Sequence, residues 1–198
     1  MSTKRRRLLG ALAGLAFCPP GRAASDGAPA DPALLLRAGG RGLVVAMRHA
    51  LAPGTFDPPG FWRGDCSTQR NLSDAGREQA RRIGAWFRTH RLEPQRVRSS
   101  SWCRCLETAR LAFDRAEPWT ALDSIVGQRP HESAHVPEMR AELARLAGVA
   151  PAGFEVWVTH QANIAALADA ATASGEALLL RHDRRRDAVV VVAALRIA

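Results

Sequence analysis

The stretch Gly42-Leu43-Val44-Val45-Ala46-Met47-Arg48-His49 decides the fold, because an unbroken apolar run of strand length ends in an arginine–histidine pair. A continuous apolar run, unlike an alternating one, predicts a strand buried on both faces, as in a parallel sheet. In open α/β sheets, ligands bind just beyond the carboxyl ends of the strands. The pair Arg48-His49 therefore lies where a binding site is expected.

Strand-like and helix-like patterns alternate through the rest of the chain. Strands are predicted at residues 97–101, 120–126 and 154–159. Helices are predicted at residues 103–113 and 161–173, and two more are expected to begin after the N-cap residue Ser73 and at Pro137. Residues 177–180 and 188–195 are expected to pair as a hairpin around the basic loop 181–187. Alternation of this kind predicts a layered α/β/α sandwich with a mostly parallel central sheet.

The first thirty residues differ in composition from the rest. The basic segment Lys4-Arg5-Arg6-Arg7 precedes ten apolar residues, about half the length that a bilayer span requires. We expect residues 1–30 to be an export signal of the twin-arginine type with a linker, directing the protein to the periplasm. A single domain is expected over residues 31–198. The alternative is an uncleaved basic tail.

Positive charge is spread over both parts of this 198-residue chain, whose net charge is +9. Residues 1–30 have five Lys or Arg and one acidic residue, so +4 belongs to them and +5 to residues 31–198. A moderate excess of this kind can attract anionic substrates. The run Arg184-Arg185-Arg186 lies between two aspartates, and no stripe of basic and aromatic residues is present. We therefore expect no nucleic-acid partner.

Three cysteines lie beyond the N-terminal segment, at positions 66, 103 and 105. In an exported protein, Cys66 is expected to pair with either Cys103 or Cys105, which leaves one thiol free. A bond between Cys103 and Cys105 would close a very short, strained ring. A three-cysteine zinc site is the alternative, although its spacing resembles no standard zinc module.

Two further positions at predicted strand ends complement Arg48-His49. His160 follows the buried strand 154–159, and Arg104 follows the strand 97–101. A guanidinium group donates bidentate hydrogen bonds to phosphate oxygens, and a neutral imidazole is a competent nucleophile toward phosphorus. Taken alone, the Arg-His pair or Arg104 would be better explained by a structural role. Together, two histidines and two arginines are what a phosphoryl-transfer pocket requires.

Four motifs follow one another along the chain: Arg48-His49-Ala50, Leu72–Ala80 (LSDAGREQA), Ser100–Ala109 (SSWCRCLETA) and His160. In order and residue type they resemble the Arg-His-Gly, Leu-Thr-x-x-Gly-x-x-Gln-Ala, Ser-x-x-x-Arg-x-x-x-Thr-Ala and second-histidine motifs of the histidine phosphatase superfamily. The resemblance spans residues 43–173. It implies a fold similar to phosphoglycerate mutase and the hydrolysis of phosphomonoesters, with mutase activity as a variant.

The resemblance also implies a role for each matching residue. His49 would form a phosphohistidine, which water would then hydrolyse. Arg48, Arg104 and His160 would hold the phosphoryl group, and no metal or cofactor is implied. Ala50 stands where the family has glycine, a change that a methyl-sized space can absorb. The acid that protonates the leaving group is expected to be Asp123, at a predicted strand end, or Glu132; a solvated turn carboxylate is the alternative for Asp123.

Residues 51–71 are rich in proline and glycine and are expected to form a long loop, whereas residues 31–41 are expected to be a linker. A loop of this length inside a compact domain is often functional. Gln69, Arg70 and Asn71 are candidates to line the pocket, with Arg70 as a further phosphate contact. The alternative is that Asn71 serves with Ser73 to cap the following helix.

A competing motif lies at His131-Glu132-Ser133-Ala134-His135, which matches the zinc-protease pattern H-E-x-x-H, with Glu155 as a conceivable third ligand. That chemistry needs a stable helix, whereas Pro130 and Pro137 flank the segment. A zinc-dependent hydrolase is therefore the second hypothesis. A third is a non-catalytic exported protein that binds a phosphorylated ligand in the same pocket. The sequence does not choose among small phosphorylated substrates or oligomeric states.

Overall fold

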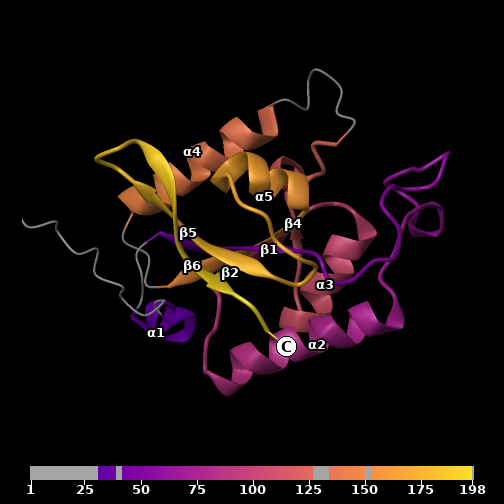
Figure 1. The fold of residues 1–198 in the computed structure, drawn as a ribbon, viewed down its shortest axis with the longest axis horizontal. Coiled ribbons are helices and arrows are strands. Elements are labelled where there is room, and N and C mark those ends of the chain that lie inside the picture. The colour runs from indigo at the N-terminus through magenta and orange to yellow at the C-terminus, as the bar shows by residue number, and fades with distance from the viewer. Residues whose placement is uncertain (1–30, 39–41, 127–133, 150–152, 198) are drawn as a thin grey trace, which may run out of the picture.

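The computed structural model describes residues 31–38, 42–126, 134–149 and 153–197. Its centre is a six-stranded sheet with the strand order β3-β2-β4-β1-β5-β6 (Figure 1). The strands are β1 (Leu43–Arg48), β2 (Arg96–Ser99), β3 (Glu117–Pro118), β4 (Phe154–Thr159), β5 (Ala177–Asp183) and β6 (Ala188–Leu195). The first four run parallel, while β5 pairs antiparallel with β1 and β6 antiparallel with β5. The predicted α/β fold with a mostly parallel sheet is confirmed, as is the hairpin.

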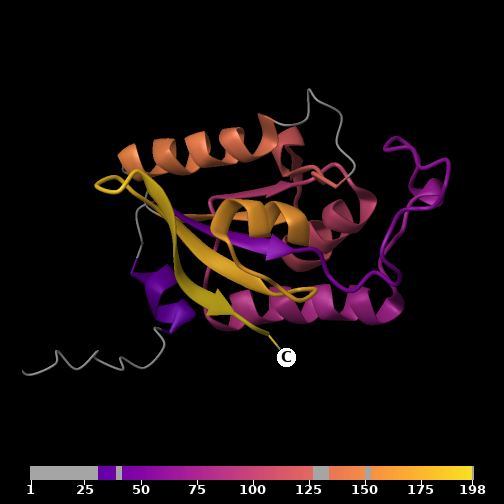
Figure 2. The same ribbon diagram turned by 45° about the horizontal axis from the view of Figure 1, so that its top comes forward.

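Helices cover both faces of this sheet (Figure 2). They are α1 (Pro32–Arg37), α2 (Asp74–Thr89), α3 (Cys103–Phe113), α4 (His135–Gly148) and α5 (Gln161–Ala168). Within β1, Val45 and Met47 join the buried cluster that includes side chains of α2 and α3. Val44 and Ala46 join the cluster that includes side chains of α4 and α5. Since successive strand residues point to opposite faces, a strand covered on both sides requires the unbroken apolar run from which the fold was predicted.

Helix α2 shows how particular residues set the local packing. Ser73 caps its N-terminus, because its hydroxyl oxygen accepts a hydrogen bond from the amide of Gly76 at 3.1 Å. A Cβ atom at Gly76 would lie 2.0 Å from the carbonyl oxygen of Leu51, and one at Gly84 would lie 2.2 Å from that of Ala112. The two glycines therefore let α2 pack directly against the segment after β1 and against α3.

Several predicted elements differ from the structure; helix α4, for example, begins at His135, two residues before Pro137, where the helix was expected to start. Residues 32–37 form α1 instead of a linker, because Asp31 caps the helix and Ala33 and Leu36 are buried. Residues 120–126 do not form a strand: Thr120–Leu122 is a 3₁₀ helix (η2), whose buried apolar side chains belong to the cluster beneath α4. Helix α5 ends at Ala168, where Asp169 adopts a left-handed backbone conformation (φ 51°).

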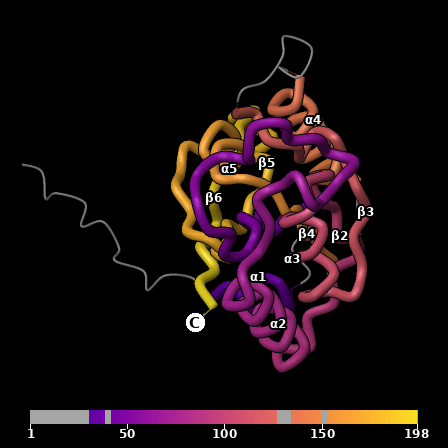
Figure 3. The backbone as a smooth tube through the Cα atoms, turned by 90° about the vertical axis from the view of Figure 1, so that its right-hand side faces the viewer, coloured from indigo at the N-terminus to yellow at the C-terminus, as the bar shows by residue number. Residues whose placement is uncertain are grey.

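The predicted loop at residues 51–71 crosses the end of the molecule at which β1 ends (Figure 3). It contains a single 3₁₀ turn, Cys66–Thr68 (η1), whose N-cap is Asp65. Cys66 forms a disulfide with Cys103 at the start of α3. This disulfide fixes the loop beside the carboxyl ends of the parallel strands.

None of the helices in the described part of the chain is both long and apolar enough to span a membrane.

Candidate active site

The ends of β1 and β4 and the start of α3 meet around a cavity of about 1080 Å³. Arg48 is the last residue of β1, His160 directly follows β4, and Arg104 is the second residue of α3. Because β1 and β4 are parallel neighbours, His49 and His160 emerge close together, with ring centroids 5.6 Å apart. All four of these predicted residues line the cavity, and so does Arg70.

His49 is held in one tautomer. Its Nδ1 lies 2.7 Å from the carbonyl oxygen of Ala50. Since a carbonyl oxygen only accepts, Nδ1 carries the proton and Nε2 carries the lone pair. Burial, followed by the charges of three nearby arginines, lowers the pKa of His49 to about 3, although the hydrogen bond to Ala50 opposes this shift. The imidazole is therefore neutral at neutral pH, as nucleophilic attack requires.

His160 is oriented by a chain of hydrogen bonds. Its Nε2 lies 2.9 Å from the hydroxyl oxygen of Ser100, which in turn donates to Oδ1 of Asp123 at 3.1 Å. Its Nδ1 lies 3.5 Å from Nη2 of Arg104, a group that only donates. This arrangement places the proton of His160 on Nε2. Burial, with nearby positive charge, lowers the pKa of His160 well below its usual value, so this ring is also neutral.

Four arginines line the cavity, and the charges of three of them, Arg48, Arg70 and Arg104, act on His49; the fourth is Arg63. Arg48 donates from Nη1 to the carbonyl oxygen of Thr172 at 3.1 Å, and Arg70 from Nη1 to that of Ala52 at 2.7 Å. Burial and the charge of Arg104 lower the pKa of Arg48 and of Arg70. The Nε atoms of Arg48, Arg70 and Arg104 are buried and have no hydrogen-bond partner among the described residues. Clustered cations with unused donors are complementary to an oxyanion.

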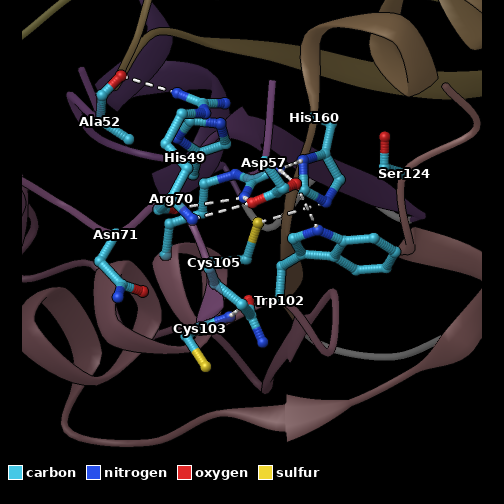
Figure 4. Close-up of polar contacts among 12 residues, drawn as sticks. His49, Ala52, Asp57, Arg70, Asn71, Trp102, Cys103, Cys105, Ser124 and His160 are labelled. Carbon is cyan, nitrogen blue, oxygen red and sulfur yellow. Dashed lines mark hydrogen bonds and ion pairs between the residues drawn. The ribbon is translucent and has the colours of Figure 1, made fainter. Parts of the chain in front are cut away.

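Asp57 is a cavity residue that the sequence analysis did not identify. Its carboxylate accepts hydrogen bonds from Nη1 and Nη2 of Arg104 at 2.8 and 3.3 Å, from the indole nitrogen of Trp102 at 3.1 Å and from the amide of Arg70 at 2.9 Å (Figure 4). Burial raises its pKa, but the hydrogen bonds from Arg104 and Arg70 outweigh burial, and the pKa of Asp57 lies below its usual value. No motif marks Asp57, because its position depends on how the loop folds back onto α3.

Asp123 lies behind His160 and is not among the residues that line the cavity. Its buried carboxylate accepts from the hydroxyl of Ser100, from the amide of Ser101 at 2.6 Å and from Nη1 of Arg63 at 2.9 Å. These contacts suit a residue that orients His160 through Ser100. They give no support to the prediction that Asp123 protonates a leaving group. Glu132, the other predicted acid, lies outside the described residues.

The loop is joined to the start of α3 by covalent and polar contacts. Of the two predicted partners of Cys66, the structure selects Cys103, with Cα atoms 5.7 Å apart, and leaves Cys105 as a buried free thiol. Gln69 accepts a hydrogen bond from the amide of Cys103 at 3.0 Å. Asn71 donates to the carbonyl oxygen of Cys66 at 2.6 Å, a contact within the loop rather than a helix cap. Of the three loop residues that were candidates to line the pocket, Gln69, Arg70 and Asn71, only Arg70 lines the cavity.

Ala50, which stands in the position of a family glycine, is accommodated. Its methyl group is fully buried in a small cluster with Ala52, Leu72 and Ala80. Its amide donates to the hydroxyl of Thr108 at 3.0 Å, so the chain after His49 is fixed against α3. The departure from the motif therefore preserves the backbone that holds His49.

The structure also bears on Cys105 as a nucleophile and on the predicted zinc site. Burial raises the pKa of Cys105 to about 12, so its thiol is protonated at neutral pH and is a poor nucleophile. His131 and Glu132 of the zinc-protease pattern lie outside the described residues. Glu155, its conceivable third ligand, accepts from Nε1 of Trp157 at 2.9 Å and pairs with Arg98 at 3.3 Å. No group of three or more potential metal-binding side chains occurs within the described ranges.

Several solved structures share this fold. The protein histidine phosphatase SixA complexed with tungstate has a TM-score of 0.52 at 19% identity, covering 77% of this chain and 96% of that one. The mycobacterial glucosyl-3-phosphoglycerate phosphatase complexed with VO3 has a TM-score of 0.53 at 16% identity, covering 79% and 99%. Phosphoglycerate mutase from Thermus thermophilus has a TM-score of 0.50 at 17% identity, covering 79% and 99%. At these identities the likeness concerns the fold alone.

No curated protein has a significantly similar sequence. The family model of the histidine phosphatase superfamily (branch 1), however, matches residues 45–193. This range begins within β1 and includes every residue that was predicted to hold the phosphoryl group. It confirms the resemblance that the four motifs indicated. The chain belongs to the histidine phosphatase superfamily.

Proposed function

We propose that the protein is a phosphatase that hydrolyses small phosphomonoesters through a phosphohistidine intermediate on His49. The observation that carries the proposal is the position of a neutral His49, with its Nε2 lone pair available, beside Arg48, Arg70 and Arg104, three of the four arginines that line the same cavity. A phosphohistidine route needs this combination of nucleophile and anion-binding groups. Two of the similar structures, both of them phosphatases, contain oxyanions, tungstate and VO3.

The proposed reaction has two steps. Nε2 of His49 attacks phosphorus, the bond to the leaving oxygen breaks, and the phosphoryl group is transferred to the imidazole. Arg48, Arg70 and Arg104 stabilise the charge on its equatorial oxygens, and His160 lies against the same space. Water then attacks phosphorus, the P–N bond breaks, and phosphate leaves. The hydrogen bond from Nδ1 to Ala50 keeps the ring in the tautomer that both steps use.

We further propose that residues 1–30 direct the protein to the periplasm and that residues 31–198 form the catalytic domain. The basic segment and short apolar stretch at the N-terminus support this. The Cys66–Cys103 disulfide gives independent support, because disulfides persist mainly in oxidising compartments. Cell fractionation tests the localisation. The full chain should show phosphatase activity in the periplasm, and the variant Arg5→Lys/Arg6→Lys/Arg7→Lys should lose it.

Phosphate release from a simple phosphomonoester tests the activity. His49→Ala should reduce turnover by at least about 10³-fold, since it removes the group that forms the intermediate. His90→Ala is the matched control, because His90 lies at the end of α2 and is not among the residues that line the cavity. Phosphate binding without turnover by the wild type would instead support the non-catalytic binding hypothesis. Activity that survives His49→Ala would overturn the proposal.

A further inference from the structure

The carboxylate of Asp57 occupies the donors that a substrate phosphate would need. Both of its oxygens pair with the two terminal nitrogens of Arg104, at 2.8 and 3.3 Å. A guanidinium group binds a carboxylate and a phosphate through the same pair of parallel hydrogen bonds. Arg104 is almost fully buried, with 4% of its side chain exposed, so few other directions of approach exist. Asp57 and a phosphate therefore compete for Arg104.

The same carboxylate is also placed to act as an acid once it is displaced. It lies in the loop that lines the cavity with His49 and His160, and its indole contact, Trp102, stacks edge-on against His160 with ring centroids 5.4 Å apart. A carboxylate that loses a guanidinium partner and gains a phosphate dianion as neighbour takes up a proton more readily. The carboxylate of Asp123, by contrast, accepts from three donors behind His160 and does not line the cavity.

We propose that substrate phosphate displaces Asp57 from Arg104 and that the freed Asp57 carboxyl group then protonates the leaving oxygen. This inference rests on the proposed phosphatase function. As phosphate enters, the carboxylate takes a proton from solvent. When Nε2 of His49 forms its bond to phosphorus, the P–O bond breaks, and the Asp57 proton goes to the leaving oxygen, which departs as an alcohol. In the second step the Asp57 carboxylate accepts a proton from the attacking water.

Leaving-group dependence tests the acid role. Asp57→Asn should lower turnover of ethyl phosphate, a poor leaving group, by about 10²-fold or more, and that of p-nitrophenyl phosphate by less than about tenfold. Asp123→Asn is the comparison: a positioning residue should affect the two esters about equally. Asp65→Asn is the control for the loop, since the carboxylate of Asp65 accepts hydrogen bonds from the amide and hydroxyl of Ser67 and does not line the cavity. It should change neither rate.

The competition is tested separately by titrating inorganic phosphate into the same variants. Asp57→Ala should bind phosphate several-fold more tightly than wild type, while Asp65→Asn should not. Equal losses on both esters would refute the acid role, and unchanged or weaker phosphate binding would refute the competition. If the wild type hydrolyses neither ester, the phosphatase proposal fails and the acid role fails with it. If the wild type hydrolyses both esters and Asp57→Asn loses both equally, only the acid role fails.

An independent observation concerns the outer part of the cavity. Phe56 and Trp62 are 75% and 67% exposed and are the most exposed aromatic side chains in the described part of the chain. Both line the cavity, together with Val126, which is 60% exposed. Single exposed apolar side chains need no explanation, but three that line the same cavity as a charged site indicate a binding surface. We infer that the leaving group of the substrate carries an apolar portion that packs against Phe56, Trp62 and Val126. This inference also rests on the proposed function.

A series of alkyl phosphates tests this inference, because ethyl, butyl and hexyl phosphate have similar leaving groups and differ in apolar length. Specificity should rise at least about tenfold from ethyl to hexyl, in line with the transfer of several methylene groups out of water. The double variant Phe56→Ala/Trp62→Ala should flatten the series, whereas Leu34→Ala, at an exposed site in α1, should not. Phenethyl phosphate distinguishes a preference for a flat ring from one for a chain. A flat series in the wild type, with ethyl phosphate still hydrolysed, would refute the inference alone.

Discussion

Reduction of the Cys66–Cys103 disulfide should destabilise the protein and loosen its active-site loop. The bond closes a chain segment with a sequence separation of 37 residues. In the chain-entropy description, a cross-link over about 37 residues restricts the unfolded chain by about 13 cal/mol/K, or about 4 kcal/mol at 25 °C. For a domain of this size, each kcal/mol corresponds to about 2–4 °C, so the expected fall in Tm is about 8–15 °C.

The assay is thermal unfolding of the wild type with and without a phosphine reductant, with the state of the thiols confirmed by titration. Wild type is the best sample for this comparison, because reduction changes no side-chain volume elsewhere. Cys66→Ala/Cys103→Ala should be insensitive to the reductant and should unfold at about the temperature of the reduced wild type. Cys105→Ala is the control, since the thiol of Cys105 is free, and it should keep the full response to reductant.

Activity should fall with the same treatment. The disulfide joins the loop that carries Arg70, a residue that lines the cavity, to the residue next to Arg104, so its loss lets Arg70 move away from the anion site. Reduced wild type should therefore show a higher KM for any ester that it hydrolyses. A reduced, thiol-verified protein with unchanged Tm and unchanged KM would refute this reasoning.

Three further predictions concern stability. The pKa of His49 is lowered from 6.5 to about 3, so the contribution of this residue to the free energy of unfolding is complete above pH 6.5 and is lost as the pH falls toward 3. Between pH 6.5 and pH 5, the free energy of unfolding measured in urea should fall by about 2 kcal/mol more in the wild type than in His49→Gln. A parallel decline in the two proteins would contradict this. Gly76→Ala should cost about 1–3 kcal/mol, because its methyl group would meet the carbonyl oxygen of Leu51, while Gly148→Ala, with no atom within 4 Å, should be neutral or slightly stabilising. Leu143→Ala, at a fully buried position, should cost about 2–5 kcal/mol by denaturant unfolding, whereas a loss below about 1 kcal/mol would mean that the core beneath α4 is not packed as described.

The sequence was sufficient for the elements that carry strong periodic signals. The apolar runs at β1 and β4 predicted buried parallel strands, and the predicted and observed bounds of α3 agree. The residues at those strand ends, His49 and His160, do converge, because parallel neighbours bring their carboxyl ends to one edge of the sheet. The part of the site that is built on the parallel strands could therefore be predicted from the sequence.

The part that depends on the loop could not. The position of Asp57 follows from its hydrogen bonds to Arg104, Trp102 and the Arg70 amide, which are long-range contacts that no local pattern encodes. The same holds for Asp123: its place behind His160 results from the 3₁₀ turn at Thr120–Leu122, where an apolar pattern had predicted a strand. Burial against α4 outweighed the local preference for extended backbone.

The most direct test of the central claim is rapid quenching of the wild type during a single turnover of a radiolabelled phosphomonoester, followed by alkaline digestion and peptide mass spectrometry. The account predicts about one acid-labile, alkali-stable phosphate per protein, located on His49 and absent from His49→Ala. Release of phosphate without any labelled enzyme species, or label on another residue, would contradict it.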